Sequence, residues 1–151
     1  MIPNTINSLM KFLKQKGYEA QYQEETDQIY VIFKVGKHEF PLFVRVYDGG
    51  NILQLLVFFP LQVPRDRLNA IARLLHFLNK EIDMPGLGMD ESVGLVFHRI
   101  MLPTATQKID QDLLESLVNT VPKICDQFFD TLLEAVNSTD DFETIQKKLK
   151  S

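Results

Sequence analysis

Apolar side chains near the start of the chain recur with the period of a helix. Ile6, Leu9, Met10 and Leu13 lie three, one and three residues apart. This spacing places their side chains on one face of a helix. Gly17 follows closely after two lysines and is typical of a helix end. The first segment is therefore predicted to form an amphipathic helix.

From residue 29 onward the apolar period changes to two. Alternating positions over 29–35 predict a β-strand, and glycine turns follow at 36–37 and 49–50. Turns of this kind join antiparallel strands. If each connection has two residues, Val35 lies opposite His38, and every other pair in a three-stranded meander follows by counting. A bulge at the second turn would instead exchange the faces of the third strand.

Both faces of the predicted meander are apolar. The first face has three rows: Phe33, Phe40, Phe59; Val31, Leu42, Val57; and Ile29, Val44, Leu55. The second face gathers the side chains of Tyr30, Ile32, Phe43, Leu56 and Phe58. An antiparallel sheet with one side in water alternates apolar and polar residues, so we expect both sides to be covered, by the chain or by a partner. The five residues of the second face are the predicted partner-binding residues.

A second helix is predicted after Pro64, with a stripe of apolar residues reaching Ile82. Leu74 and Phe77 fall outside this stripe and widen the apolar surface of the helix. Such a helix needs a second contact, either within the domain or with another copy of the chain. We assign Leu74 and Phe77 to a homodimer contact on this basis.

The remaining segments complete an α+β fold: a helix, a three-stranded antiparallel meander, a helix, a β-hairpin and a long C-terminal helix. Residues 89–102 form the predicted hairpin, and a long apolar stripe over 109–136 predicts the last long helix, which Pro122 should bend or break. Residues 1–139 are predicted to form a single domain. Residues 140–151 should form a short polar C-terminal helix or tail.

Composition and charge exclude several classes of protein. The 151 residues carry 16 basic and 20 acidic side chains, a net charge of −4, which argues against nucleic acid or an anionic membrane as the main partner. No apolar run approaches the roughly 20 residues of a membrane span. The single cysteine, Cys125, cannot form an internal disulfide and fits a reducing compartment. A cytoplasmic location without membrane insertion is therefore expected.

Candidate catalytic groups are few. His38, His76 and His98 lack the spacing of metal ligands, so we expect no metal site and no cofactor. Cys125 lies in the long apolar helix and is interpreted as a packed thiol. His98 is expected to make a solvated contact near Asp90 and Glu91 across the hairpin. These observations favour a protein that is not an enzyme.

Acidic residues dominate the last third of the chain, where only Lys123 opposes the nine carboxylates between residues 110 and 143. They are Asp110, Asp112, Glu115, Asp126, Asp130, Glu134, Asp140, Asp141 and Glu143. The simplest interpretation is a solvated helix face. Attraction of a basic partner is the alternative.

The order of elements resembles the YbjN family and the class I type III secretion chaperones. The specific part is a strand and helix followed by a hairpin: Leu53 to Phe59, then Pro60, Val63 and Pro64, then Ala72, Arg73, Leu75, Leu78 and Asn79, and finally Leu102-Pro103. Class I chaperones generally form homodimers and hold an extended segment of a secreted client against apolar surface. The resemblance implies the same use for the second sheet face and for Leu74 and Phe77.

Three functions follow from the sequence. The first is a non-enzymatic, dimeric module that binds a protein client or partner. The alternative is a regulatory or sensory domain that binds a small apolar ligand between the sheet and the helices. The third, which the sequence supports least, is an enzyme with a site assembled from His98, Asp90 and Arg99.

Overall fold

The computed structural model describes all residues from Met1 to Ser151 and has the predicted α+β fold. Its helices are α1 (Ile6–Gln15), α2 (Leu68–Asn79), α3 (Gln111–Asn137) and α4 (Phe142–Lys150). Its strands are β1 (Ile2–Pro3), β2 (Gln21–Gln23), β3 (Gln28–Val35), β4 (His38–Tyr47), β5 (Ile52–Gln62), β6 (Leu87–Asp90), β7 (Leu95–Pro103) and β8 (Lys108–Ile109). Short 3-10 turns lie at Asp48–Gly50 and Arg65–Arg67.

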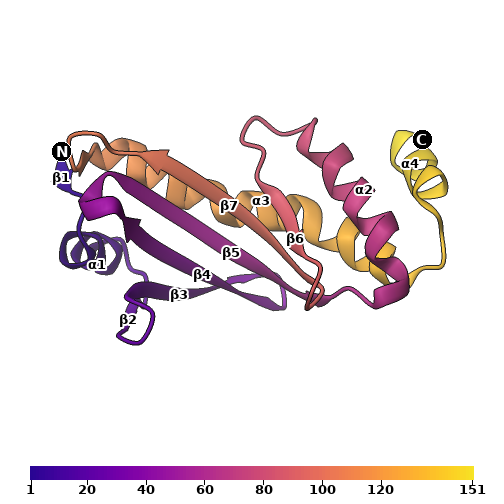
Figure 1. Ribbon diagram of the computed structural model, residues 1–151, viewed down its shortest axis with the longest axis horizontal. Helices are drawn as coiled ribbons and strands as arrows, with labels where there is room; N and C mark the ends of the chain where they lie inside the picture. The colour runs from indigo at the N-terminus through magenta and orange to yellow at the C-terminus, as the bar shows by residue number, and fades with distance from the viewer.

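Six strands form one antiparallel sheet in the order β2-β3-β4-β5-β7-β6, and β1 pairs with β8 separately (Figure 1). The counted register of the meander is confirmed, because Val35 pairs with His38 and Phe43 with Leu56. The second connection is longer than predicted, since the last pair joins Tyr47 to Ile52. Lengthening the loop by one residue on each side keeps the same register and the same faces.

The first apolar face of the sheet packs against α3, which runs behind the sheet in Figure 1. Phe40 on this face is fully buried, and its ring lies edge-on to Phe129 of α3 at a centroid distance of 5.4 Å. Val31 and Val57 beside it are also completely buried. Burying one such side chain stabilises the fold by about 1.5–3 kcal/mol. The layer between this sheet face and α3 is therefore the centre of the core, which buried side chains of α1 and α2 extend.

The homodimer contact expected on α2 is not available for Leu74, because that side chain is fully buried within the chain. Phe77 is half-buried, and its ring packs edge-on against Phe142 of α4 at 6.1 Å. Of the two forms predicted for residues 140–151, a helix or a tail, the structure has the helix, and its Phe142 and Ile145 are buried. α2 has more apolar surface than one sheet face can cover. α4 makes the second contact with this helix.

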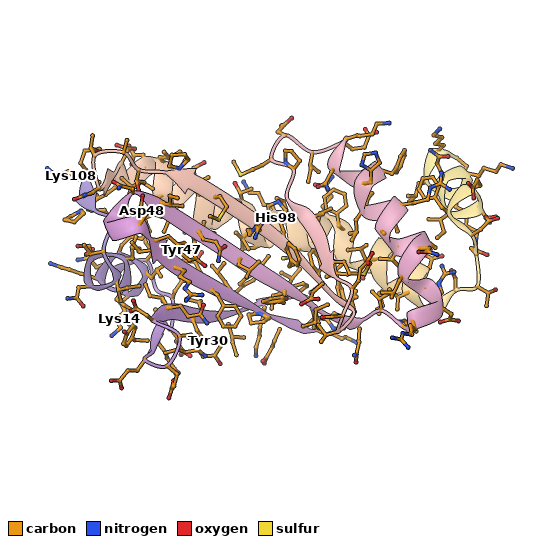
Figure 2. All side chains as sticks on the ribbon, viewed as in Figure 1. Lys14, Tyr30, Tyr47, Asp48, His98 and Lys108 are labelled. Carbon is orange, nitrogen blue, oxygen red and sulfur yellow. The ribbon has the colours of Figure 1, made fainter.

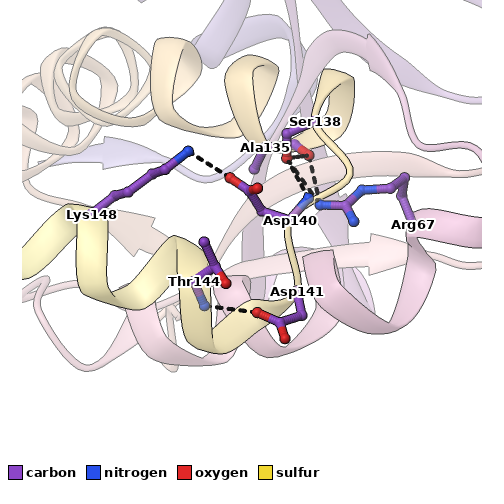
Figure 3. A network of polar contacts seen from close by, with 7 residues as sticks. All are labelled: Arg67, Ala135, Ser138, Asp140, Asp141, Thr144 and Lys148. Atoms are coloured by element: carbon purple, nitrogen blue, oxygen red, sulfur yellow. Dashed lines mark hydrogen bonds and ion pairs between the residues drawn. The ribbon is translucent and has the colours of Figure 1, made fainter.

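A polar network holds the joint between α3 and α4 (Figure 3). Arg67 donates hydrogen bonds to the carbonyl oxygen of Ala135 at 2.8 Å and to the Ser138 hydroxyl at 3.3 Å. The guanidinium therefore neutralises the negative end of the α3 dipole. Lys148 and Asp140 form an ion pair at 2.6 Å on the α4 side of the joint. Together these contacts set where α4 leaves α3.

The predicted break of the last long helix at Pro122 does not occur. α3 runs without interruption over 27 residues with Pro122 inside it. Proline has no backbone N–H, so the carbonyl of Val118 lacks its usual helical donor. Val118, Val121 and Cys125 on the same helix are buried. The packing of this apolar stripe keeps the helix continuous despite the lost hydrogen bond.

Candidate partner-binding surface

The second face of the sheet carries no helix and remains open (Figure 1). We define the open face by its side chains on the four long strands: Tyr30, Ile32, Pro41, Phe43, Arg45, Leu56, Phe58, Phe97, Arg99 and Met101. Ile32 is 44% exposed and Met101 46% exposed. The other apolar members are half-buried, mainly by one another. The chain covers only one side of its sheet, so the expectation of cover on both sides is not met within the chain.

A row of four aromatic rings crosses the open face from strand to strand, with a step of two residues between β4 and β5. Tyr30 stacks on Phe43 at a centroid distance of 5.9 Å, and Phe43 lies edge-on to Phe58 at the same distance. Phe58 in turn lies edge-on to Phe97 at 6.3 Å. The row begins at Tyr30, toward the β2–β3 edge of the sheet in Figure 2. Adjacent rings fix one another's orientation and form a rigid apolar strip.

The last ring of the row extends over the neighbouring strand, β6. Phe97 pairs with Gly88, and a Cβ atom at Gly88 would lie only 2.7 Å from the Phe97 ring. A side chain at residue 88 would therefore require the Phe97 ring to move from this position. The absence of a side chain at residue 88 lets the aromatic row reach the β6 edge.

Two arginines lie beside the aromatic row on opposite sides of β5. Arg45 projects from β4 and pairs with Gln54, while Arg99 projects from β7 and pairs with Leu56. The Arg45 guanidinium lies 5.1 Å from the ring centre of Tyr47, and that of Arg99 lies 5.9 Å from Phe97. All three ion pairs of the structure involve other side chains. Arg99 is exposed and Arg45 is half-buried, and neither has an acidic partner within the chain.

All five predicted partner-binding residues lie together on the open face: Tyr30, Ile32, Phe43, Leu56 and Phe58. The sequence analysis missed Phe97, Arg99 and Met101, because it placed residues 93–102 in a separate hairpin. The alternation over Leu95–Pro103 predicts two faces, but it does not say that this strand pairs with β5. Strand order was the information needed to find these three residues.

The proposed His98 site does not assemble. His98 is buried on the helix-covered face, where its Nε2 donates to the Met84 carbonyl at 2.9 Å, and Arg99 projects from the opposite face. Asp90 pairs with Leu95, three residues from His98 along the strand. The expected solvated contact of His98 with Asp90 and Glu91 is therefore wrong. His98 is buried, and residues three apart along a strand, such as Leu95 and His98, point to opposite faces.

Titratable groups elsewhere are buried singly or lie on the surface. Burial raises the pKa of the Cys125 thiol to about 12, which favours the unreactive thiol form. Burial lowers the pKa of His98, while its hydrogen bond to Met84 acts in the opposite direction. No group of three or more histidine, cysteine or acidic side chains is arranged to hold a metal ion. No helix is long and apolar enough to cross a membrane.

A separate groove lies among α2, α3 and α4, away from the open face. Its volume is about 590 Å³, and apolar side chains of Phe77, Leu78, Phe128 and Leu149 contribute to its lining. Polar side chains complete the lining: Lys80, Glu81, Gln127, Thr131, Gln146 and Lys150. The groove has the size of a small-molecule site, although it is open to solvent and its lining is mixed.

The architecture defines a small α+β protein whose antiparallel sheet is covered by helices on one side only. Residues 5–134 match the family model for YbjN, which is described as "Putative bacterial sensory transduction regulator". The match spans most of the chain, so the chain belongs to the YbjN family. It ends before α4, which covers residues 142–150.

Two solved structures have the same fold. The crystal structure of YbjN from E. coli superposes with a TM-score of 0.62 at 11% identity, over 82% of this chain and 86% of that one. An uncharacterized protein from Methanothermobacter thermautotrophicus superposes with a TM-score of 0.54 at 10% identity, over 87% of this chain and 98% of that one. No curated protein sequence matches the chain significantly. At identities this low, the superpositions establish the shared fold only. The function has to be argued from the candidate site.

Proposed function

We propose that this protein is a cytoplasmic, non-enzymatic regulator. It binds a segment of a protein client or partner on its open face. The observation that carries the proposal is the aromatic row from Tyr30 to Phe97 on a sheet side without a helix. Aromatic side chains supply much of the energy at protein interfaces, because they bury a large area with little loss of side-chain freedom. Apolar side chains gathered on an uncovered surface mark a site of interaction.

Photo-crosslinking in the source cell tests the proposal. A photo-reactive residue replaces Ile32 on the open face in one variant and Lys123 on the exposed side of α3 in another. We expect a discrete crosslinked protein from position 32 and none from position 123. The same crosslinks from both positions would contradict the proposal, since they would report general proximity.

Binding of the purified crosslinked partner gives the quantitative test. Phe43→Ala should weaken binding about thirtyfold, because truncating an aromatic hot spot commonly costs about 2 kcal/mol. Leu113→Ala is the matched control, since Leu113 is also exposed, at 44%, but lies on α3. Circular dichroism must show that both variants fold. Unchanged affinity of a folded Phe43→Ala variant would contradict the proposal.

The proposal includes a homodimer, as the resemblance to class I secretion chaperones implies. The burial of Leu74 inside the protomer means that a second copy would have to meet another surface. Light scattering at high micromolar concentration tests this part separately. A monomer under these conditions would remove the dimer and leave binding on the open face intact.

A small-molecule sensor is the second candidate. The groove among α2, α3 and α4 favours it, because its volume of about 590 Å³ lies within the range of ligand pockets. The site would lie among helices, away from the sheet–helix layer that the sequence suggested. Native mass spectrometry of protein purified from the source cell would show a bound small molecule. Phe77→Ala should reduce its occupancy, and Phe43→Ala should not.

A further inference from the structure

We infer that the open face selects acidic partners: its occupant is an amphipathic protein segment that carries carboxylates beside its apolar side chains, with Arg45 and Arg99 as their binding residues. This inference rests on the proposed function and adds the chemistry of the partner. It follows from the charge on the open face, which differs from that of the whole chain.

The protein carries a net charge of −4, yet the centre of the open face is basic. Arg45 and Arg99 flank β5, and the residues opposite them on that strand, Gln54 and Leu56, are uncharged. The other charges on this face lie away from its centre: Lys34 and Glu39 are directly opposite each other and cancel, and Asp90 pairs with Leu95 at the start of β7, four residues from Arg99. Two uncompensated cations thus remain beside the aromatic row.

Both guanidinium groups are placed to receive a carboxylate. Each lies near an aromatic ring, at 5.1 Å for Arg45 and 5.9 Å for Arg99, and neither takes part in an ion pair of the chain. A guanidinium near a ring keeps N–H donors free at its edge, where a carboxylate can accept two hydrogen bonds. The rings limit the freedom of the arginines, so less entropy is lost when a partner binds.

Strand geometry sets the spacing that the partner must match. The two arginines are two strands apart and offset by two residues, which corresponds to about 12 Å across the sheet. Carboxylates two turns apart on a helix are separated by about 11 Å along its axis. A helical segment can therefore reach both arginines while its apolar side chains contact the aromatic row.

The opposite side of the molecule would repel such a partner. The exposed face of α3 carries Asp126, Asp130 and Glu134, and the sheet separates this face from the arginines. Like charge on one side and opposite charge on the other orient an acidic partner toward the open face. A second copy of the chain fits less well, because the apolar side chains of α3 other than Leu113 are largely buried and its exposed face is mainly polar and charged.

Two synthetic peptides of about 18 residues test the inference. Both place Leu and Phe along one helical stripe, and they differ only in having Glu or Lys at the remaining positions. Fluorescence anisotropy should show the acidic peptide binding at least about tenfold more tightly than the basic one. The preference should weaken as sodium chloride is raised, because the charges are exposed.

The double variant Arg45→Gln/Arg99→Gln should remove the preference for the acidic peptide. Arg65→Gln is the matched control, since Arg65 is exposed in the turn before α2 and outside the open face. If both peptides bind equally well and Phe43→Ala removes this binding, the charge selection is overturned and the proposed function stands. Binding of neither peptide would also overturn it, while the crosslinking experiment decides the proposed function independently. Tight binding of single-stranded oligothymidylate through the two arginines, without a peptide preference, would overturn both in favour of a nucleic-acid ligand.

Discussion

The buried imidazole of His98 links the stability of the protein to pH. Its Nε2 donates to the Met84 carbonyl at 2.9 Å, while its buried Nδ1 has no hydrogen-bond partner. Protonation would place a second N–H donor and a charge at Nδ1, where nothing accepts them. The pKa of His98 in the folded protein is consequently below its ordinary value, with desolvation as the larger cause.

This pKa shift predicts lower stability in mild acid. The unfolded state takes up a proton as the pH falls through about 6.5, and the folded state takes it up only at lower pH. The stabilisation is complete above about pH 6.5 and is lost as the pH falls toward the folded-state pKa. His98→Gln, which keeps a donor for Met84, should flatten the fall in urea midpoint between about pH 7 and pH 5. His76→Gln, at an exposed histidine, is the control. If the urea midpoint falls equally in the wild type and in His98→Gln, protonation of His98 is not the cause.

Cys125 should be unreactive in the folded protein. Its thiol is completely buried in α3, and its raised pKa of about 12 leaves almost no thiolate at neutral pH. Iodoacetamide should therefore modify it only in denaturant. Ser116→Cys, at an exposed position of the same helix, is the positive control and should react within minutes. Rapid modification of native Cys125 would show that this part of α3 opens.

At the scale of elements, α3 contains a correctable defect at Pro122. The carbonyl of Val118 cannot receive a hydrogen bond from residue 122, and the packing of the apolar stripe offsets this loss. Pro122→Ala should raise the free energy of unfolding by about 1–3 kcal/mol. Asn119→Ala, at an exposed position nearby, is the control and should add at most about 0.7 kcal/mol through helix propensity. Chemical denaturation measures both, and a destabilised Pro122→Ala variant would mean that the core requires a helix shaped by proline.

At the scale of the whole molecule, α4 is a cover that lies beyond the part of the chain matched by the family model. Phe142 and Ile145 are buried, and Phe142 contacts Phe77 and the Arg73 guanidinium. The Arg73–Glu143 ion pair at 2.6 Å is exposed, so it adds little to this contact. The attachment of α4 therefore depends mainly on two apolar side chains.

Phe142→Ala should detach α4 without unfolding the domain. We expect a loss of about 2–3 kcal/mol, the scale of burying one large apolar side chain, since the helix can leave rather than keep a cavity. Hydrogen exchange should show faster exchange over 142–150, with the sheet amides still protected. Leu149→Ala is the control, because that side chain is 41% exposed. Loss of protection throughout the sheet would show that α4 belongs to the cooperative core.

Much of the fold could be predicted from local patterns. The meander register follows from the period of two and the glycine turns, so the grouping of Tyr30, Phe43 and Phe58 was determined by the sequence alone. The physical reason is that each strand alternates its side chains between two faces, and a short turn fixes which residues lie opposite. The helices at both ends of the chain follow in the same way from the helical period.

Only the tertiary structure decided which surfaces are covered. Pairing of β7 with β5 placed Phe97 and Arg99 on the open face and His98 in the core, and docking of α4 supplied a contact to Phe77 on α2. These arrangements depend on segments far apart in the chain, whose pairing no local period encodes. The sequence determined which side chains share a face. Long-range packing decided that one apolar face became the core and the other remained open.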